Sequence, residues 1–241
     1  MGRPAGVAAL VALALLAPVA AHAESPRALA SSKASLSVGY PNDGSIVRAK
    51  RLRPSPHLVI LEKSKDRSYA YPSLVLMLQR SAKQIAKAFK GAKLVVGDLS
   101  AKDGGPLSGH HSHQSGRDAD IAFYARDPKG RVVQPKKFVA YGADGKAKDK
   151  SGLVFDDALN WALVESFAKD HRAGLAYIFI SKPLKARLLA YANRHDKHRK
   201  NVEKVQALFV QPDGAEPHDD HFHVRIRCPK GQEDVCKEQP K

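Results

Sequence analysis

The chain has 241 residues, with 40 Lys and Arg against 24 Asp and Glu, which gives a formal net charge of +16 at pH 7. Its length suits one ordinary domain that can bury a good core, and we see no internal repeat. The positive charge favours polyanionic partners, but no nucleic-acid-binding motif accompanies it.

The N-terminal segment is typical of a secretory signal peptide. An Ala-, Val- and Leu-rich run from Val7 to Val19 is followed by Ala-His-Ala at 21–23, which fits the small-x-small cleavage rule. The run is shorter than the roughly 20 residues that span a bilayer, so a retained anchor is the less favoured alternative. We therefore expect a signal peptide over 1–23, a loose lead-in over 24–36, and a single exported domain over 37–241.

The first half of this domain predicts short strands around one helix. Residues 38–56 mix Gly, Pro, Asn and Arg and predict turns and irregular structure. The apolar stretches 57–61 and 94–98 predict strands. Between them, residues 72–89 predict a helix that starts at a proline, carries its apolar residues on one face, and is followed by Gly91.

The second half predicts further helices and strands in mixed order. The Lys- and Gly-rich stretch 123–149 predicts a hairpin with loops, which fits either a substrate-groove wall or an ordinary insertion. Residues 156–169 predict an amphipathic helix, 176–181 a buried strand and 183–193 another helix, followed by the basic tract 194–204. Because strands and helices do not alternate regularly, we predict an α+β fold.

Six of the eleven histidines lie in two short windows of the sequence. The first window, residues 108–124, reads SGHHSHQSGRDADIAFY, and the second, residues 217–227, reads PHDDHFHVRIR. Neutral imidazole and carboxylate are ligands that zinc takes readily. The histidines concerned are His110, His111, His113, His218, His221 and His223.

Strand periodicity brings several of these side chains to shared faces. Residues two apart on a strand point the same way, so His221 and His223 share one face, as do Asp118 and Asp120. If the two strands are neighbours, His113, Asp120 and one histidine of the pair can form a metal site. The other histidine of the pair can then act as a general base, and the spacing does not say which is which.

Two alternatives are a structural metal site and a solvated surface patch. A structural zinc site more often uses four ligands with cysteine among them. The two cysteines of this chain, Cys228 and Cys236, lie outside both windows. In an exported chain such a pair predicts a disulfide, and a cysteine ligand is the weaker interpretation.

At these residues the chain resembles the penicillin-insensitive murein endopeptidases, within the wider metallopeptidase group that includes lysostaphin-type and D-Ala-D-Ala peptidases. The family pattern of His-x6-Asp with a distant His-x-His is matched by His113, Asp120, His221 and His223. The flanks SGHHSHQSGRDADI and PHDDHFHVRIRC extend the match, and the resemblance covers about residues 40–228.

The resemblance implies one catalytic zinc ion held by both windows. The implied metal ligands are His113, Asp120 and His223, with His110 close to the metal as a candidate further ligand; the implied base is His221, and His218 assists. His111 has no assigned role. The resemblance also implies a small antiparallel sheet with the metal on one face, helices packed behind it, and long loops around the groove.

The implied reaction is hydrolysis of D-alanyl-meso-diaminopimelate cross-links in peptidoglycan. No serine nucleophile takes part, which explains insensitivity to β-lactams that acylate serine. Two other functions stay open: a D,D-carboxypeptidase acting on single stem peptides, and a zinc-containing murein-binding protein without turnover.

Overall fold

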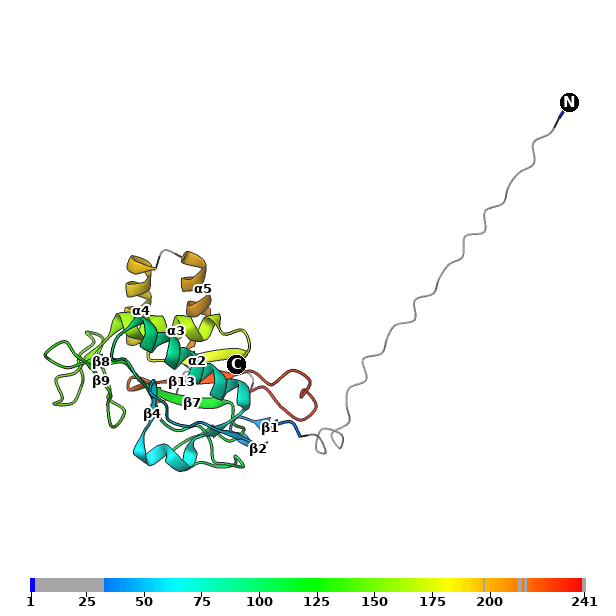
Figure 1. Ribbon diagram of the computed structural model, residues 1–241, viewed down its shortest axis with the longest axis horizontal. Helices are drawn as coiled ribbons and strands as arrows, with labels where there is room; N and C mark the ends of the chain where they lie inside the picture. The colour runs from blue at the N-terminus through cyan, green and yellow to red at the C-terminus, as the bar shows by residue number, and fades with distance from the viewer. Residues whose placement is uncertain (3–32, 197, 212–213, 215, 240–241) are drawn as a thin grey trace.

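The chain folds into helices and strands in mixed order, as predicted for an α+β protein (Figure 1). The computed structural model describes residues 1–2, 33–196, 198–211, 214 and 216–239. The predicted signal peptide and most of the lead-in lie outside the described residues. Within the described part, no helix is long and apolar enough to span a membrane.

A six-stranded mixed sheet forms the centre of the fold, in the order β12-β11-β13-β7-β6-β4. The inner neighbours pair antiparallel, and each edge pair, β11 with β12 and β4 with β6, is parallel. The predicted antiparallel sheet is therefore the middle of a larger mixed one. The strands are β4 Leu58–Ile60, β6 Leu94–Val96, β7 Asp118–Ala122, β11 Leu175–Phe179, β12 Phe209–Val210 and β13 His221–Ile226.

The two strands that carry the histidine and aspartate pairs are direct neighbours. β13 runs antiparallel to β7, with His223 opposite Asp120 and Arg225 opposite Asp118. Phe222, which lies between the two histidines and points the other way, is fully buried in the hydrophobic core. The alternation therefore places polar side chains on one face of the sheet and apolar side chains on the other.

Helices cover the apolar face. α2 packs on α3, and α3 in turn contacts α4 and α5, the pair that stands out at the top of Figure 1. The Asp156 carboxylate caps α3 by accepting a hydrogen bond from the Leu159 N–H (3.0 Å). The helices are α2 Pro72–Ala88, α3 Asp157–Lys169, α4 Lys182–His195 and α5 Arg199–Leu208, with the 3-10 helix η1 at Glu62–Arg67.

Two local features differ from the predictions. Residues 38–56 are not simply irregular, because β1 (Leu36–Tyr40) and β2 (Asp43–Val47) form an antiparallel hairpin. β3 (Lys50–Arg51) then pairs with β5 (Tyr69–Ala70). The helix α5 was not predicted within the basic tract, since its buried residues are only Val202 and Val205.

The predicted hairpin in the Lys- and Gly-rich stretch is confirmed. β8 (Ala125–Arg126) pairs antiparallel with β9 (Val132–Val133), and β10 (Val154–Phe155) joins β8 on its other side. The segment between β9 and β10 forms a long loop with isolated bridges. This loop returns to the polar face of the central sheet.

The predicted disulfide between Cys228 and Cys236 is present, with its Cα atoms 5.7 Å apart. The loop that it closes contacts the N-terminal hairpin: the Ser37 N–H donates to the Gln232 side-chain oxygen (3.0 Å), and Gly39 forms a bridge with Cys236. The C-terminal segment is thus fastened to β1.

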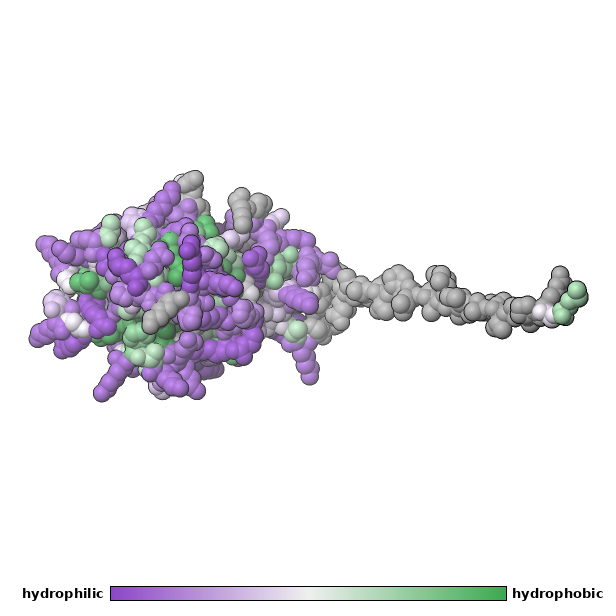
Figure 2. Space-filling model, turned by 90° about the horizontal axis from the view of Figure 1, so that it is seen from above, coloured by the Kyte–Doolittle hydropathy of each residue, from purple (hydrophilic) through white to green (hydrophobic). Residues whose placement is uncertain are grey.

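Arg117 connects this C-terminal segment to the sheet. Its guanidinium is fully buried and donates to the Glu238 carboxylate (3.1 Å), to the Lys237 carbonyl (2.7 Å) and to the Cys228 sulfur (3.2 Å). Because Arg117 directly precedes β7, these bonds fix the start of the strand that carries Asp120. The face seen in Figure 2 is mainly hydrophilic, with small scattered hydrophobic patches, as the net charge leads one to expect.

Candidate metal centre

The side chain of Asp120 lies at the centre of a cluster of histidines. It is 1% exposed, and its Oδ1 lies 3.2 Å from His113 Nε2, 3.4 Å from His221 Nε2 and 3.7 Å from His223 Nδ1. Its Oδ2 lies 3.7 Å from His110 Nδ1. The fold therefore brings together four histidines and the aspartate that the sequence singled out.

In the first window, the imidazoles of His110 and His113 each use their second nitrogen to bind a fixed acceptor. His113 Nδ1 donates to the Leu99 carbonyl (2.6 Å), and His110 Nε2 donates to the Asp98 carboxylate (2.8 Å). A carbonyl or carboxylate oxygen only accepts hydrogen bonds, so the nitrogen bound to it carries the proton. In the neutral ring, the nitrogen facing Asp120 then presents a lone pair.

The second window repeats the arrangement. His223 Nε2 donates to Asp118 Oδ1 (2.8 Å), and His221 Nδ1 donates to Asp220 Oδ1 (2.5 Å). In both rings the other nitrogen faces Asp120. In their neutral forms, the four imidazoles would aim lone pairs at one carboxylate, which has only lone pairs to offer in return.

This arrangement fits a cation. Among the described residues, His113 Nε2 and both carboxylate oxygens of Asp120 are buried without a hydrogen-bond partner, which is costly unless a positive charge lies between them. His110, His113 and Asp120 offer ligand atoms that all lie within 4.8 Å of one another. Imidazole and carboxylate donors suit zinc and other first-row divalent ions, so the site can hold a metal without specifying which.

The electrostatics of the cluster also favour positive charge beside Asp120. Burial opposes ionisation of this carboxyl, but His113 and His221 lower its pKa well below the usual range. Burial likewise opposes the charge on His221, yet Asp120 and Asp220 raise the pKa of His221 to about 10. The buried carboxylate therefore stays ionised and stabilises positive charge beside it, on a histidine ring or on a metal ion.

His218 lies beside this cluster and does not face Asp120 directly. Its ring stacks on Phe179 (centroids 5.6 Å apart) and lies 5.4 Å from the ring of His221 and 5.5 Å from that of His223. Burial and the two neighbouring histidines lower the pKa of His218 to about 4, so it is neutral at pH 7. His111 is exposed, outside the cluster.

Asp118 is an important residue whose function was not predicted. It is fully buried and accepts hydrogen bonds from His223 Nε2 (2.8 Å), Arg225 Nε (2.6 Å) and the His113 backbone N–H (3.3 Å). Burial opposes its ionisation, but Arg225 and His223 lower its pKa below the usual range. The sequence did indicate that Asp118 lies on the same strand face as Asp120, because the two residues are two positions apart.

Asp98 performs the same function for His110. Besides the His110 ring, its carboxylate accepts a hydrogen bond from Arg67 Nη1 (3.0 Å), and Arg67 also donates to the Ser108 carbonyl (3.0 Å). Burial opposes ionisation of Asp98, while His110, Ser64 and Arg67 lower its pKa to about 2. The sequence placed Asp98 at the end of a strand without indicating its partner.

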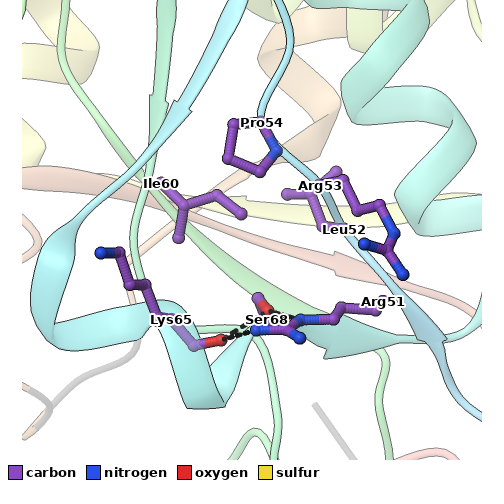
Figure 3. Close-up of a pocket in the computed structure, with 7 residues that line it drawn as sticks. All are labelled: Arg51, Leu52, Arg53, Pro54, Ile60, Lys65 and Ser68. Carbon is purple, nitrogen blue, oxygen red and sulfur yellow. Dashed lines mark hydrogen bonds between the residues drawn. The ribbon is translucent and has the colours of Figure 1, made fainter.

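A cavity of about 420 Å³ lies beside η1, and none of the histidines of the metal centre lines it. Figure 3 shows its lining, in which apolar side chains meet three cationic ones. The lining residues are Arg51, Leu52, Arg53, Pro54, Ile60, Lys65 and Ser68.

Comparison with known proteins places the whole domain in one group. The model of a family described as penicillin-insensitive murein endopeptidase matches residues 37–241. Proteins named penicillin-insensitive murein endopeptidase from Escherichia coli O1:K1 / APEC and from Escherichia coli strain SMS-3-5 are each 30% identical over 242 residues. The alignment covers 96% of this chain and 81% of either relative.

Proposed function

Because the chain belongs to the penicillin-insensitive murein endopeptidase family, we propose that it hydrolyses the D-alanyl-meso-diaminopimelate cross-links of peptidoglycan. The observation that carries the proposal is the convergence of four imidazole rings on the buried carboxylate of Asp120. Peptidoglycan lies outside the cytoplasm, so the proposal includes export to the periplasm by the signal peptide at 1–23, with residues 37–241 as the catalytic domain.

The proposed cofactor is a single zinc ion, held by His110, His113, Asp120 and His223. Three imidazoles and one carboxylate are donors that zinc prefers, and each ring is oriented by its own acceptor. When bound, zinc supplies Lewis-acid polarisation of the scissile carbonyl and lowers the pKa of a coordinated water.

In this mechanism His221 is the general base. The Asp220 carboxylate fixes its Nδ1, so its Nε2 can take a proton from the attacking water and return it to the leaving amine. The negative charge of Asp120 is the main cause of the raised pKa of His221. A cation bound at Asp120 would offset this charge. The pKa then moves toward the range in which imidazole accepts a proton near neutral pH.

His218 is proposed to bind the oxyanion. Its lowered pKa keeps the ring neutral at pH 7, so one nitrogen carries a proton that it can donate as a hydrogen bond. The ring is held against Phe179, close to both histidines of β13. A pre-oriented donor of this kind stabilises negative charge that develops on the carbonyl oxygen.

The test of the function is incubation of the protein, without residues 1–23, with a purified cross-linked muropeptide dimer, read by mass spectrometry. We expect conversion to monomers, loss of conversion with a chelator, recovery with zinc, and no effect of penicillin. A monomeric stem peptide in a parallel reaction identifies carboxypeptidase trimming. A folded, zinc-loaded protein that leaves the dimer intact refutes the proposal.

The role of His221 has its own test. His221→Ala should lower kcat by about 10²–10⁴-fold, the usual contribution of a general base, while the protein retains one equivalent of zinc. The matched control is His111→Ala, which removes an exposed histidine outside the cluster and should leave kcat unchanged. Full turnover by His221→Ala means that another group is the base.

A further inference from the structure

Phe138 brings the long loop between β9 and β10 to the metal centre. Its ring stacks on the ring of His221, with centroids 4.6 Å apart and planes 21° from parallel. The ring also packs against the buried side chains of Leu61, Val95 and Ala122. The side chain is therefore a fixed wall beside the candidate base.

Gly97 makes room for this ring. A Cβ atom at Gly97 would lie 2.3 Å from Phe138 Cζ, far closer than atoms can approach. Gly97 is not among the glycines with positive φ, so its backbone conformation does not require glycine. Its N–H also donates to the Asp120 carbonyl (2.8 Å), which ties this point of the chain to β7. The missing side chain at 97 thus allows Phe138 to reach His221.

Lys63, an exposed residue, places a positive charge over the Phe138 ring. Its Nζ lies 5.4 Å from the centroid of the Phe138 ring, within the range of a cation–π contact. Its neighbour Lys65 forms an ion pair with Glu62 (2.5 Å), whereas no carboxylate of the described chain pairs with Lys63. The ammonium is therefore positioned by the ring and available to an anion from solution.

The chemistry of the reaction indicates which anion this is. His221 is the group that returns a proton to the leaving amine, so the leaving side of the cross-link lies beside His221. In a D-alanyl-meso-diaminopimelate link, the carbon bonded to the scissile nitrogen carries a free carboxylate. We propose that Lys63, positioned by Phe138, binds this carboxylate; the proposal rests on the proposed function.

The decisive experiment compares two muropeptide dimers, one with this carboxylate free and one with it converted to a carboxamide. Lys63→Gln should raise KM for the carboxylate dimer by about three- to tenfold with little change in kcat, as for an exposed charge pair. It should not change cleavage of the carboxamide dimer. Lys63→Arg, which keeps the charge, should retain most of the wild-type KM.

The matched control is Lys65→Gln, on the same turn of η1. Lys65 lines the separate cavity of Figure 3, so Lys65→Gln should not change the KM for either dimer. If Lys63→Gln slows both dimers equally, or slows neither, the carboxylate subsite is refuted. If the wild-type protein cuts neither dimer, the proposed function fails. The carboxylate subsite is then tested separately, by calorimetric binding of the two dimers to zinc-loaded wild-type and Lys63→Gln proteins. If Lys63→Gln lowers the affinity for both dimers equally, or for neither, the carboxylate subsite is refuted.

Discussion

Asp118→Asn is the substitution that most directly tests how the metal centre is held. In the native protein, Asp118 Oδ1 accepts from His223 and Arg225, and Oδ2 accepts from the His113 backbone N–H. An asparagine of the same shape has one oxygen and one NH₂ group. If the oxygen faces His223 and Arg225, the NH₂ opposes the His113 N–H; if the amide flips, the other two donors lose their acceptor.

The magnitude follows from the burial of these groups. Removing one partner of a buried ion pair costs about 3–5 kcal/mol. The Arg225 guanidinium keeps a hydrogen bond to Gln239 (3.0 Å) and the face of Phe179, so we expect the lower end, about 3 kcal/mol of unfolding free energy. Loss of the carboxylate that orients His223 should weaken zinc binding by about 10–100-fold.

Two measurements check this prediction. Competition with a chromogenic chelator gives the zinc affinity, and urea unfolding with and without zinc gives the stability. Asp144→Asn, which removes an exposed carboxylate, is the matched control for the change in net charge and should alter neither. Wild-type zinc affinity in Asp118→Asn refutes the idea that this carboxylate positions the ligands.

Two further predictions concern residues outside the histidine cluster. Gly97→Ala should cost about 1–3 kcal/mol of unfolding free energy, because its Cβ overlaps Phe138. In a Phe138→Ala background this cost should largely vanish. Equal costs in both backgrounds, measured by urea unfolding, contradict the steric account. Replacing Cys228 and Cys236 by serine opens a loop with a sequence separation of 8 and should cost about 2–3 kcal/mol. The thermal midpoint should fall relative to that of the oxidised wild-type protein and match that of the reduced wild-type protein; a midpoint equal to that of the oxidised protein contradicts this estimate.

Periodicity in the sequence was enough to predict the strands of the site. The alternation around His221 and around Asp120 predicted two strands with polar faces, and the structure pairs them in register, with His223 opposite Asp120. The predicted helix at 72–89 matches α2, which starts at the predicted Pro72. These features are local, because a two- or 3.6-residue period and a terminal proline act within one element.

Partners distant in sequence could not be predicted in this way. The bond between Asp98 and His110 and that between Asp118 and His223 depend on which chain segments meet across the fold. A period gives the face on which a side chain lies but not the residue opposite it. Phe138 illustrates the same limit, since a loop between two short strands carries no period that points to its contact.

The residues whose contacts build the site lie far apart in the sequence, and this affects when the site can form during synthesis. Asp118 and His223 are 105 positions apart, and the bond that joins Ser37 to Gln232 spans 195. Contacts of this range form late, because the intervening chain must lose entropy before they are gained. During synthesis from the N-terminus, β7 therefore waits for β13, and His223 joins Asp120 only when the chain is nearly complete. The cluster around Asp120 is therefore incomplete until the last strand, β13, has been made and has paired with β7.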